Sequence, residues 1–536
     1  MHPAPEFDVV INGGGPVGMG LAIELGQRGV RVCVIELYPE PQPVPKGQNL
    51  TQRTAEHFRA WGCEAELRAA HPLPKDAGIG GMTLYRTLLS EHALDWFNRA
   101  AVGEYYFGKN ARVPQYKSEA VLRARAAALD TVILRYGWQG TRLSQAEDGV
   151  RLTITNTKMA QTEEVRGAYL VGTDGSRSMV REGAGISETR AEHDRLMALL
   201  VFNSTELHTL LNRHPGKAIY KVLHPDLQGY WTFFGRVDHG KSWFFHAPVP
   251  MGTTADNFDF RAFLHRAVGQ EFEFEQTYLG FWNLRIALAD RYRKGRVFIA
   301  GDAAHSHPPY GGYGINTGLE DARNLGWKLS ATLQGWGGAG LLDSYTAERR
   351  PVFASTARDF IERYIEKDRK FLKEFNPDKD AAVFDRAWAE SQSDTWDVDQ
   401  FEPNYEGSPI VPGSSGTPSA LGHHSFLARP GHLLPPPGPG GDHSIGDLLG
   451  PDLTLLAADT ACLAAFSDAA GSLGVPLTTV VLPADWKTAY GTDRILLRPD
   501  RFVAWDGAED LPPADIIAAS LGGANAPVTA HTRGGK

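Results

Sequence analysis

The chain has 536 residues, which is too long for a single compact core, so we expect two or three domains. Hydrophobic residues make up 42% and charged residues 22% of the chain, proportions that are ordinary for a globular protein. The net charge of −9 is spread along the chain without a block of like charge, which argues against binding to nucleic acid or to an anionic membrane surface.

Cysteine usage and the N-terminal residues indicate the cellular compartment of the protein. Cys33, Cys63 and Cys462 form no Cys-x-x-Cys pair, and no Cys/His set has the spacing of a zinc site. Residues 1–8 lead directly into an apolar strand without a secretion signal, and no apolar run is long enough to cross a bilayer. We therefore expect a cytoplasmic protein with no membrane association and no disulfide framework.

Residues 7–36 have the pattern of a strand, a glycine-rich turn, a helix and a second strand. The turn fits Gly-x-Gly-x-x-Gly and supplies the expected cofactor-binding residues Gly13, Gly15, Pro16, Val17 and Gly18. In such a site the first glycine permits a tight turn, the second lets the backbone approach a pyrophosphate, and the third lets the helix pack close to the strand. Glu36 ends the second strand, where an acidic side chain accepts hydrogen bonds from an adenosine ribose. The segment predicts a dinucleotide site but does not distinguish FAD from NAD.

The middle of the chain has a different character. Residues 190–285 are rich in aromatic side chains, and their short apolar runs indicate antiparallel strands of a sheet with one buried face. Four aromatic residues of these runs are candidates for lining a substrate pocket: Trp231, Phe233, Trp243 and Phe245.

The longest motif follows a strand expected at residues 295–300. It reads Gly-Asp-Ala-Ala-His over residues 301–305 and Pro-Pro-Tyr-Gly-Gly-Tyr-Gly-Ile-Asn-Thr-Gly over residues 308–318. This ordered run resembles the second FAD motif of the class A flavoprotein aromatic hydroxylases, of the phenol and 2-hydroxybiphenyl hydroxylase type. Residues 173–181, which begin Thr-Asp-Gly-Ser-Arg, resemble that family's Asp-Gly fingerprint. The resemblance covers most of the chain.

A bound FAD is the first implication of this resemblance. Asp302, at a strand end, would accept hydrogen bonds from the ribityl hydroxyls, and a helix from about Ile315 would direct its positive end at the flavin ring. The other residues that the resemblance places at the cofactor are Lys46, Gln48, Gln115, Asp174, Pro309, Gly312, Gly314 and Asn316. The sequence departs from the family at Lys46, where Arg is common, and at Tyr313, where Gln or Leu is usual. The change at Tyr313 bears on the redox tuning and mobility of the flavin.

The sequence does not name the group that activates a substrate hydroxyl. Gln48 and Arg112 flank segments expected beside the flavin, and they are the candidate catalytic residues. Pro309, Tyr310 and Gly311 of the second motif are further candidates for the substrate pocket. No metal site is predicted, because the histidines of that motif lack a third ligand.

The C-terminal third contains a long charged helix, expected over about residues 343–372, and then residues 395–445, which have the Pro, Gly and Ser content of a linker. Residues 429–448 and 497–505 resemble the thioredoxin-like C-terminal domain of this subgroup, here without a cysteine pair. The fold class is therefore α/β, a Rossmann-like FAD-binding domain with an inserted β-sheet substrate domain and a thioredoxin-like C-terminal domain. The predicted boundaries are 1–75, 110–190 and 286–390 for the FAD-binding domain, 76–109 and 191–285 for the substrate domain, 391–425 for the linker and 426–536 for the C-terminal domain.

The activity implied by the resemblance is that of a monooxygenase that consumes NADH or NADPH. It would insert one oxygen atom of O2 into a phenolic or polycyclic aromatic ring through a flavin C4a-hydroperoxide. The nicotinamide would bind transiently, because the chain has no second full Gly-x-Gly-x-x-Gly unit. Alternatives are a Baeyer–Villiger or epoxidising polyketide oxygenase, an FAD reductase or dehydrogenase that does not use O2, and a non-catalytic FAD-binding interaction protein. A homodimer is a further expectation, with the C-terminal domain serving packing and subunit contacts.

Overall fold

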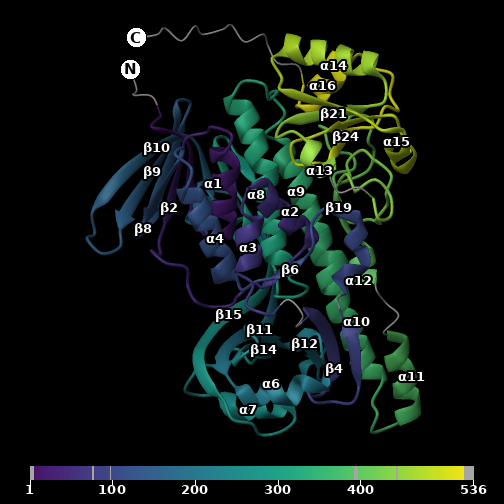
Figure 1. Cartoon of the computed structure of the whole chain (residues 1–536). Helices are drawn as coiled ribbons and strands as arrows, with labels where there is room; N and C mark the ends of the chain where they lie inside the picture. The colour runs from purple at the N-terminus through teal and green to yellow at the C-terminus, as the bar shows by residue number, and fades with distance from the viewer. Residues whose placement is uncertain (1–4, 75–77, 97, 392–395, 442–444, 524–536) are drawn as a thin grey trace.

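Three large sheets and a set of long helices organise the chain, as the computed structural model shows (Figure 1). The described residues are 5–74, 78–96, 98–391, 396–441 and 445–523. Two eight-stranded sheets lie at opposite ends of the view, and a four-stranded sheet lies beside the first of them (Figure 1).

The first sheet is mainly parallel and has the order β16-β17-β10-β1-β2-β7, with β8 and β9 attached to β10 as antiparallel strands. Its strands are β1 (Phe7–Asn12), β2 (Val32–Glu36), β7 (Val132–Tyr136), β8 (Trp138–Ala146), β9 (Gly149–Asn156), β10 (Thr162–Gly172), β16 (Arg293–Lys294) and β17 (Val297–Ile299). β1 and β2 are apolar almost throughout, as expected of parallel strands that are buried on both faces. The carboxyl ends of β1, β2, β10 and β17 meet at one edge, which is where ligands bind in sheets of this kind.

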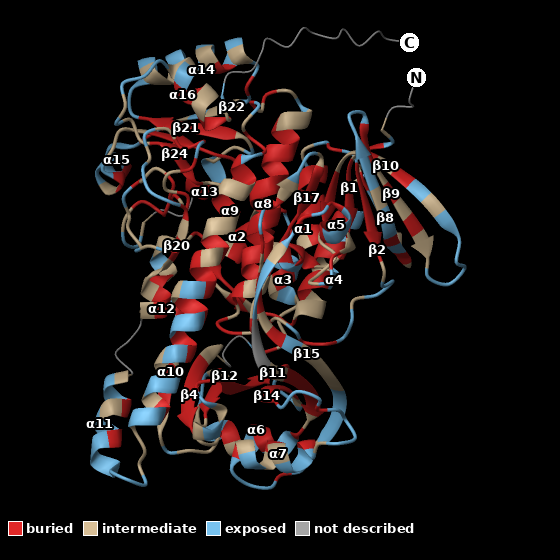
Figure 2. Cartoon of the chain, turned by 180° about the vertical axis from the view of Figure 1, so that it is seen from behind, coloured by how far each residue is buried: buried red, intermediate tan, exposed pale blue. Residues whose placement is uncertain are grey.

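Helices pack on this sheet and on one another. They are α1 (Pro16–Gly26), α2 (Gln52–Ala60), α3 (Glu64–Ala69), α4 (Gln115–Ala127), α5 (Met179–Gly183) and α8 (Tyr313–Leu333). α1 follows the glycine turn directly. Pro16 occupies its first position, where a backbone N–H would have no partner within the helix. α8 packs against α1 and is buried along most of its length (Figure 2). It begins at Tyr313, slightly before the Ile315 start that the sequence predicts, because Gly312 adopts the left-handed conformation (φ +69°) and ends the preceding loop.

The second sheet has the order β18-β15-β11-β14-β13-β12-β4-β5. Its strands are β4 (Gly80–Tyr85), β5 (Ala93–Trp96), β11 (Glu188–Asn203), β12 (Lys217–Leu223), β13 (Trp231–Arg236), β14 (Ser242–Val249), β15 (Glu275–Ala289) and β18 (His305–Ser306). Adjacent strands are antiparallel except β4 and β12. Helices α6 (Thr205–Leu210) and α7 (Phe260–Val268) cover one face over an apolar core (Figure 1). The opposite face points toward the half of the chain that contains the first sheet (Figure 1).

A long helical run connects the two halves of the molecule (Figure 1). The helix predicted over about residues 343–372 consists of α9 (Ser344–Ser355), a π-helical segment (Thr356–Glu362) and α10 (Arg363–Glu374). The short elements that follow are α11 (Ala381–Ser391), α12 (Trp396–Asp399), β19 (Phe401–Asn404) and β20 (Ser419–Leu421).

The C-terminal unit is a four-stranded sheet of order β22-β21-β23-β24. Its elements are α13 (Ile445–Leu448), β21 (Leu453–Ala457), α14 (Thr460–Leu473), β22 (Leu477–Val481), α15 (Ala484–Tyr490), β23 (Arg494–Leu497), β24 (Val503–Trp505) and α16 (Pro513–Ser520). Cys33, Cys63 and Cys462 are free thiols, so this unit carries no redox-active pair. The predicted α/β fold class is confirmed, and we keep the predicted domain boundaries as a proposal. No helix in the described part of the chain is long and apolar enough to span a membrane.

Candidate active site

Two adjoining cavities lie at the carboxyl edge of the first sheet. The larger has a volume of about 680 Å³ and reaches from this edge to the face of the second sheet. The smaller, of about 410 Å³, lies between β1, β2 and the loop after β10. Gly15, Lys46 and Gln115 line both cavities, so the two share a wall.

The glycine turn between β1 and α1 forms the junction of the two cavities. Gly13 has φ +113°, and a Cβ there would lie 2.4 Å from the carbonyl oxygen of Thr173. A Cβ at Gly18 would lie 1.9 Å from the carbonyl oxygen of Gly13, so this glycine serves the packing of helix on turn. A Cβ at Gly15 would have no neighbouring atom within 4 Å, so this glycine faces open space. The backbone at Gly15 is therefore accessible to a phosphate group at the start of α1.

The smaller cavity contains two of the predicted acidic residues, Glu36 and Asp174. The carboxylate of Glu36 accepts hydrogen bonds from the backbone N–H of Gly14 at 2.6 Å and of Tyr38 at 2.7 Å. Each oxygen keeps a second lone pair that a ribose hydroxyl could use. Asp174 accepts from Asn12 Nδ2 at 3.1 Å, and burial raises the pKa of its carboxyl although several hydrogen bonds act against this. Both acids thus shape the loops as well as the cavity.

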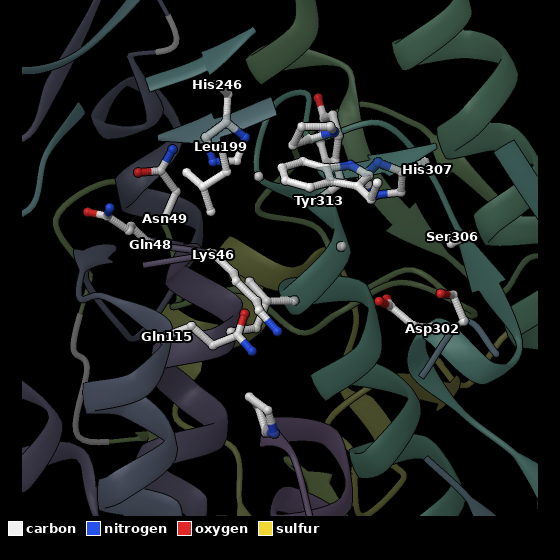
Figure 3. Close-up of a pocket in the computed structure, with 18 of the residues that line it drawn as sticks. Lys46, Gln48, Asn49, Gln115, Leu199, His246, Asp302, Ser306, His307 and Tyr313 are labelled. Carbon is white, nitrogen blue, oxygen red and sulfur yellow. The ribbon is translucent and has the colours of Figure 1, made fainter. Parts of the chain in front are cut away.

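Predicted cofactor residues line the larger cavity from several elements. They are Gly15, Pro16, Val17, Lys46, Gln48, Gln115, Asp302, Pro309, Gly312, Gly314 and Ile315. Figure 3 shows Lys46 and Gln115 on one side of the cavity and Asp302 on the other. Asp302 lies in the 3-10 turn Gly301–Ala303 that follows β17, and its side chain is exposed to the cavity. A ligand between these walls would meet an amide, an ammonium and a carboxylate.

Asn316 has a role that the sequence did not indicate. Its Nδ2 donates to the carbonyl oxygens of Gly312 at 2.6 Å and Asn49 at 2.8 Å. Its Oδ1 accepts from the backbone N–H of Thr51 at 2.9 Å and from the hydroxyl of Thr54 at 2.6 Å. All hydrogen-bonding positions of the side-chain amide are therefore occupied, and the amide connects the start of α8 to the segment before α2. Any contact of Asn316 with a cofactor would be made by its backbone.

Arg112, one of the two candidate catalytic residues, is a buried cation in the cavity wall. It lies in β6 (Ala111–Arg112) and donates to Asn49 Oδ1 at 3.0 Å and to the carbonyl oxygen of Arg236 at 3.2 Å. Burial lowers the pKa of its guanidinium to about 9, and the acceptors it reaches are neutral. Gln48, the other candidate, has a buried amide whose nitrogen and oxygen have no hydrogen-bond partner among the described residues.

Aromatic and apolar side chains of the second sheet close the far end of the larger cavity. Trp96, Phe233, Phe244 and Trp282 line it together with Leu199 and His246. Trp96 and Phe233 stack with their ring centroids 5.6 Å apart. Among the residues predicted for the substrate pocket, Phe233, Pro309 and Gly311 border this space.

The other aromatic predictions need correction. Trp243 and Phe245 are fully buried in the core beneath α6 and α7, on the opposite face of the sheet. Side chains alternate between faces along a strand, so their neighbours Phe244 and His246 border the cavity instead. Trp231 and Tyr310 pack on each other, with centroids 4.6 Å apart, behind the cavity wall.

The residues that the sequence missed are Trp96, Phe244, His246 and Trp282. The signal that could have found Phe244 and His246 is the two-residue alternation of β14, but it leaves open which set faces the cavity. No cluster of three or more potential metal ligands occurs within the described ranges.

Comparison with known proteins places this site in a family. Residues 6–359 match the family described as FAD binding domain. The chain is 31% identical to a 4-methyl-5-nitrocatechol 5-monooxygenase from Burkholderia sp, over 95% of this chain and 96% of the relative. It is 29% identical to an aklavinone 12-hydroxylase from Streptomyces purpurascens, over 93% of this chain and 95% of the relative. A solved ternary complex of aklavinone-11 hydroxylase with FAD and aklavinone is similar with a TM-score of 0.80 and 26% identity, over 97% of this chain and 100% of that chain.

The chain belongs to the FAD-binding-domain family, and the resemblance to class A flavoprotein hydroxylases is confirmed. It is a flavin-dependent monooxygenase with FAD as its cofactor.

Proposed function

We propose that this monooxygenase consumes NADH or NADPH and hydroxylates a phenolic substrate of one or several fused rings. The observation that carries the proposal is the larger cavity, in which a dinucleotide-type glycine turn and the N-terminus of α8 face an aromatic sheet surface. A planar cofactor ring and a planar substrate ring can meet between these walls without water.

The residues at the edge of the first sheet fit FAD. The open backbone at Gly15 suits the pyrophosphate, and Glu36 suits the adenosine ribose. Asp302, Lys46 and Gln115 would hold the ribityl chain and flavin along the larger cavity. The positive end of α8 would favour negative charge on the flavin ring. When bound, FAD would accept hydride from NAD(P)H and supply the redox chemistry that places one oxygen atom of O2 on the substrate.

The protein's own contribution is to hold the substrate ring and to keep water out. Trp96, Phe233, Phe244 and Trp282 offer apolar ring faces and edges at the end of the cavity. The Arg112 guanidinium lies 5.9 Å from the centroid of the Phe244 ring and has neutral hydrogen-bond acceptors. A buried cation of this kind would favour negative charge that develops on an oxygen of the substrate.

The names of the relatives narrow the substrate class. One is named for a nitrated catechol and another for the hydroxylation of aklavinone. A catechol is a hydroxylated aromatic ring, so a phenol with electron-rich ring positions is the substrate class that we propose. NADH or NADPH would bind transiently, because the sequence contains one dinucleotide motif.

The deciding experiment measures the oxidation of NADH and NADPH by the FAD-loaded enzyme in air, with and without a panel of phenols and catechols. We expect phenol-stimulated oxidation, matching O2 uptake and a product heavier by one oxygen atom. Stimulated oxidation that yields a lactone or an epoxide would replace hydroxylation with Baeyer–Villiger or epoxidising chemistry. Oxidation without O2 uptake would overturn the proposal.

A further inference from the structure

His246 occupies the middle of β14, on the sheet face that borders the larger cavity. Its register partners are Leu199 on β11 and Phe233 on β13, and both of these also line the cavity. Figure 3 shows the imidazole beside Leu199, at the sheet end of the cavity. A small group bound among the aromatic side chains would therefore lie within reach of this ring.

The surroundings of the imidazole are apolar. The ring of Phe244 meets it edge-on at 5.0 Å and that of Trp282 at 5.3 Å, measured between centroids. His246 is 4% exposed, and its Nε2 is buried without a hydrogen-bond partner among the described residues. A buried polar atom without a partner is unfavourable, so a ligand that supplies the missing hydrogen bond gains affinity.

The charge state of His246 follows from its burial. Burial lowers the pKa of the imidazole to about 3, and no charged neighbour contributes to this shift. The ring is therefore neutral at physiological pH and carries one N–H donor and one acceptor nitrogen. A hydroxyl group is complementary to such a ring, because it can donate to the acceptor nitrogen or accept from the N–H.

Two charged groups of the cavity have protein partners, whereas the Gln48 amide, like Nε2 of His246, has none among the described residues. Arg112 donates to Asn49 and to the backbone of Arg236. Arg285 donates to the carbonyl oxygen of Ser176 at 3.1 Å. His246 is thus a polar group at the aromatic end whose hydrogen bond is left for a ligand.

We propose that His246 binds the phenolic hydroxyl group of the substrate and makes the enzyme select hydroxyarenes over arenes of the same shape. The inference rests on the proposed function for the nature of the substrate, and it adds the residue that recognises the hydroxyl. The phenol O–H donates to the unprotonated ring nitrogen, while the rings of Phe244 and Trp282 hold the aromatic part.

The test is a binding titration of the FAD-loaded enzyme, followed by the change in its visible flavin spectrum. The probes are 1-naphthol and 1-methylnaphthalene, which share a shape and differ in a hydroxyl or methyl group. Wild type is expected to bind 1-naphthol at least tenfold more tightly, because a site built for a hydroxyl rejects an analogue that leaves its polar group unpaired. His246→Leu is expected to weaken 1-naphthol binding about tenfold while 1-methylnaphthalene binds as well or better.

Two further variants separate recognition from folding. His246→Gln keeps an acceptor oxygen in the cavity and is expected to retain part of the preference for 1-naphthol. His239→Leu changes a histidine in the exposed turn between β13 and β14, and it is expected to bind both probes like wild type. The FAD content of each purified variant shows whether it has folded.

An unchanged preference in a flavin-loaded His246→Leu enzyme would overturn the inference, and so would a wild type that binds neither probe or does not distinguish them. Should His246→Leu lose FAD, the comparison of His246→Gln with wild type decides, since complete loss of the preference in that variant contradicts acceptor recognition. Wild type that prefers 1-naphthol but forms no oxygenated product from any phenol would keep the hydroxyl site and overturn the proposed function instead.

Discussion

Gly235 is a glycine inside β13, and two cavity side chains use the space above it. A Cβ built there would lie 2.1 Å from Cε1 of Phe244 and 2.6 Å from Nη2 of Arg112. The guanidinium reaches the carbonyl oxygen of the next residue, Arg236, because nothing projects from Gly235. One missing methyl group thus lets a cation from the first half of the chain lie on the second sheet.

Gly235→Ala is expected to reduce the free energy of unfolding by about 1–3 kcal/mol, since Phe244 and Arg112 must both shift and Arg112 then loses its hydrogen bond to Arg236. Urea unfolding of the variant measures this loss. Gly240→Ala is the control, because the nearest atom to its Cβ is Asp238 Oδ1 at 3.7 Å in an exposed turn. Equal stability of the two variants would contradict the close packing at Gly235.

Asp302→Ala is expected to lower FAD retention about tenfold or more, because on our proposal the carboxylate would supply hydrogen bonds worth about 1.5–3 kcal/mol to the ribityl hydroxyls. The flavin-to-protein ratio after gel filtration measures the effect. Asp302→Asn keeps one acceptor oxygen and is expected to fall between the alanine variant and wild type. Full flavin occupancy in folded Asp302→Ala would remove Asp302 from the site.

At the scale of elements, helix α8 contributes to both the candidate active site and the buried core. Its N-terminus borders the larger cavity, and its later turns carry buried charges. Lys328 of α8 donates to Glu348 of α9 at 2.6 Å, and Arg498 donates to the same carboxylate at 2.6 and 3.0 Å. All three side chains are fully buried. The network fixes the position of α8 relative to α9.

Glu348→Ala leaves two buried cations without their shared partner and is expected to cost about 3–5 kcal/mol of unfolding free energy. Chemical denaturation measures the cost. The matched control is Glu366→Ala, which removes a solvent-exposed pair with Arg369 and is expected to cost less than about 1 kcal/mol. A small effect of Glu348→Ala would show that water or other groups compensate the cations.

The same carboxylate makes stability depend on pH. Burial raises the pKa of Glu348, but the charges of Arg498 and Lys328 outweigh it and hold the pKa well below the ordinary 4.5. The stabilisation provided by ionised Glu348 is complete above the pKa that this carboxyl has in the unfolded chain, and it is lost as the pH falls toward the pKa in the folded protein. The loss amounts to about 2 kcal/mol between pH 4.5 and pH 3. Glu348→Gln lacks this dependence, so its unfolding free energy is expected to fall less steeply than that of wild type over this range. Parallel curves from urea unfolding would contradict the assignment.

At the scale of the whole molecule, the hairpin between β23 and β24 joins the C-terminal unit to the FAD-binding half. Asp500 accepts from Nε1 of Trp327 at 3.0 Å, and its carbonyl oxygen accepts from Arg53 at 2.6 Å. Arg323 donates to the carbonyl oxygen of Pro499 at 2.6 Å. The C-terminal unit therefore packs as part of one core with α8, without a thiol pair of its own.

Calorimetric unfolding is expected to show the FAD-binding half and the C-terminal unit melting in one transition, because breaking the hairpin contacts exposes buried charges on both sides. Added FAD is expected to raise the midpoint of this whole transition. The C-terminal unit would be independent if two transitions appeared and FAD moved one of them.

Local chemistry made much of the cofactor half predictable. Gly18 is required by a backbone contact within its own turn and Gly13 by its positive φ, and such local constraints leave a fixed spacing in the sequence. The substrate half was less predictable. The choice between Trp243 or Phe245 and their neighbours Phe244 or His246 depends on how β14 pairs with β11 and β13, which are distant in the chain.

The sequence by itself determined the fold class, the FAD-binding motif and the monooxygenase family, because these depend on short-range backbone geometry and on an ordered run of residues. The tertiary structure alone decided that His246 borders the cavity, that Asn316 is saturated and that Arg112 lies over Gly235. These facts depend on which strands pair, on which sheet face each side chain lies and on which distant segment packs against it. A local sequence pattern does not specify these long-range contacts.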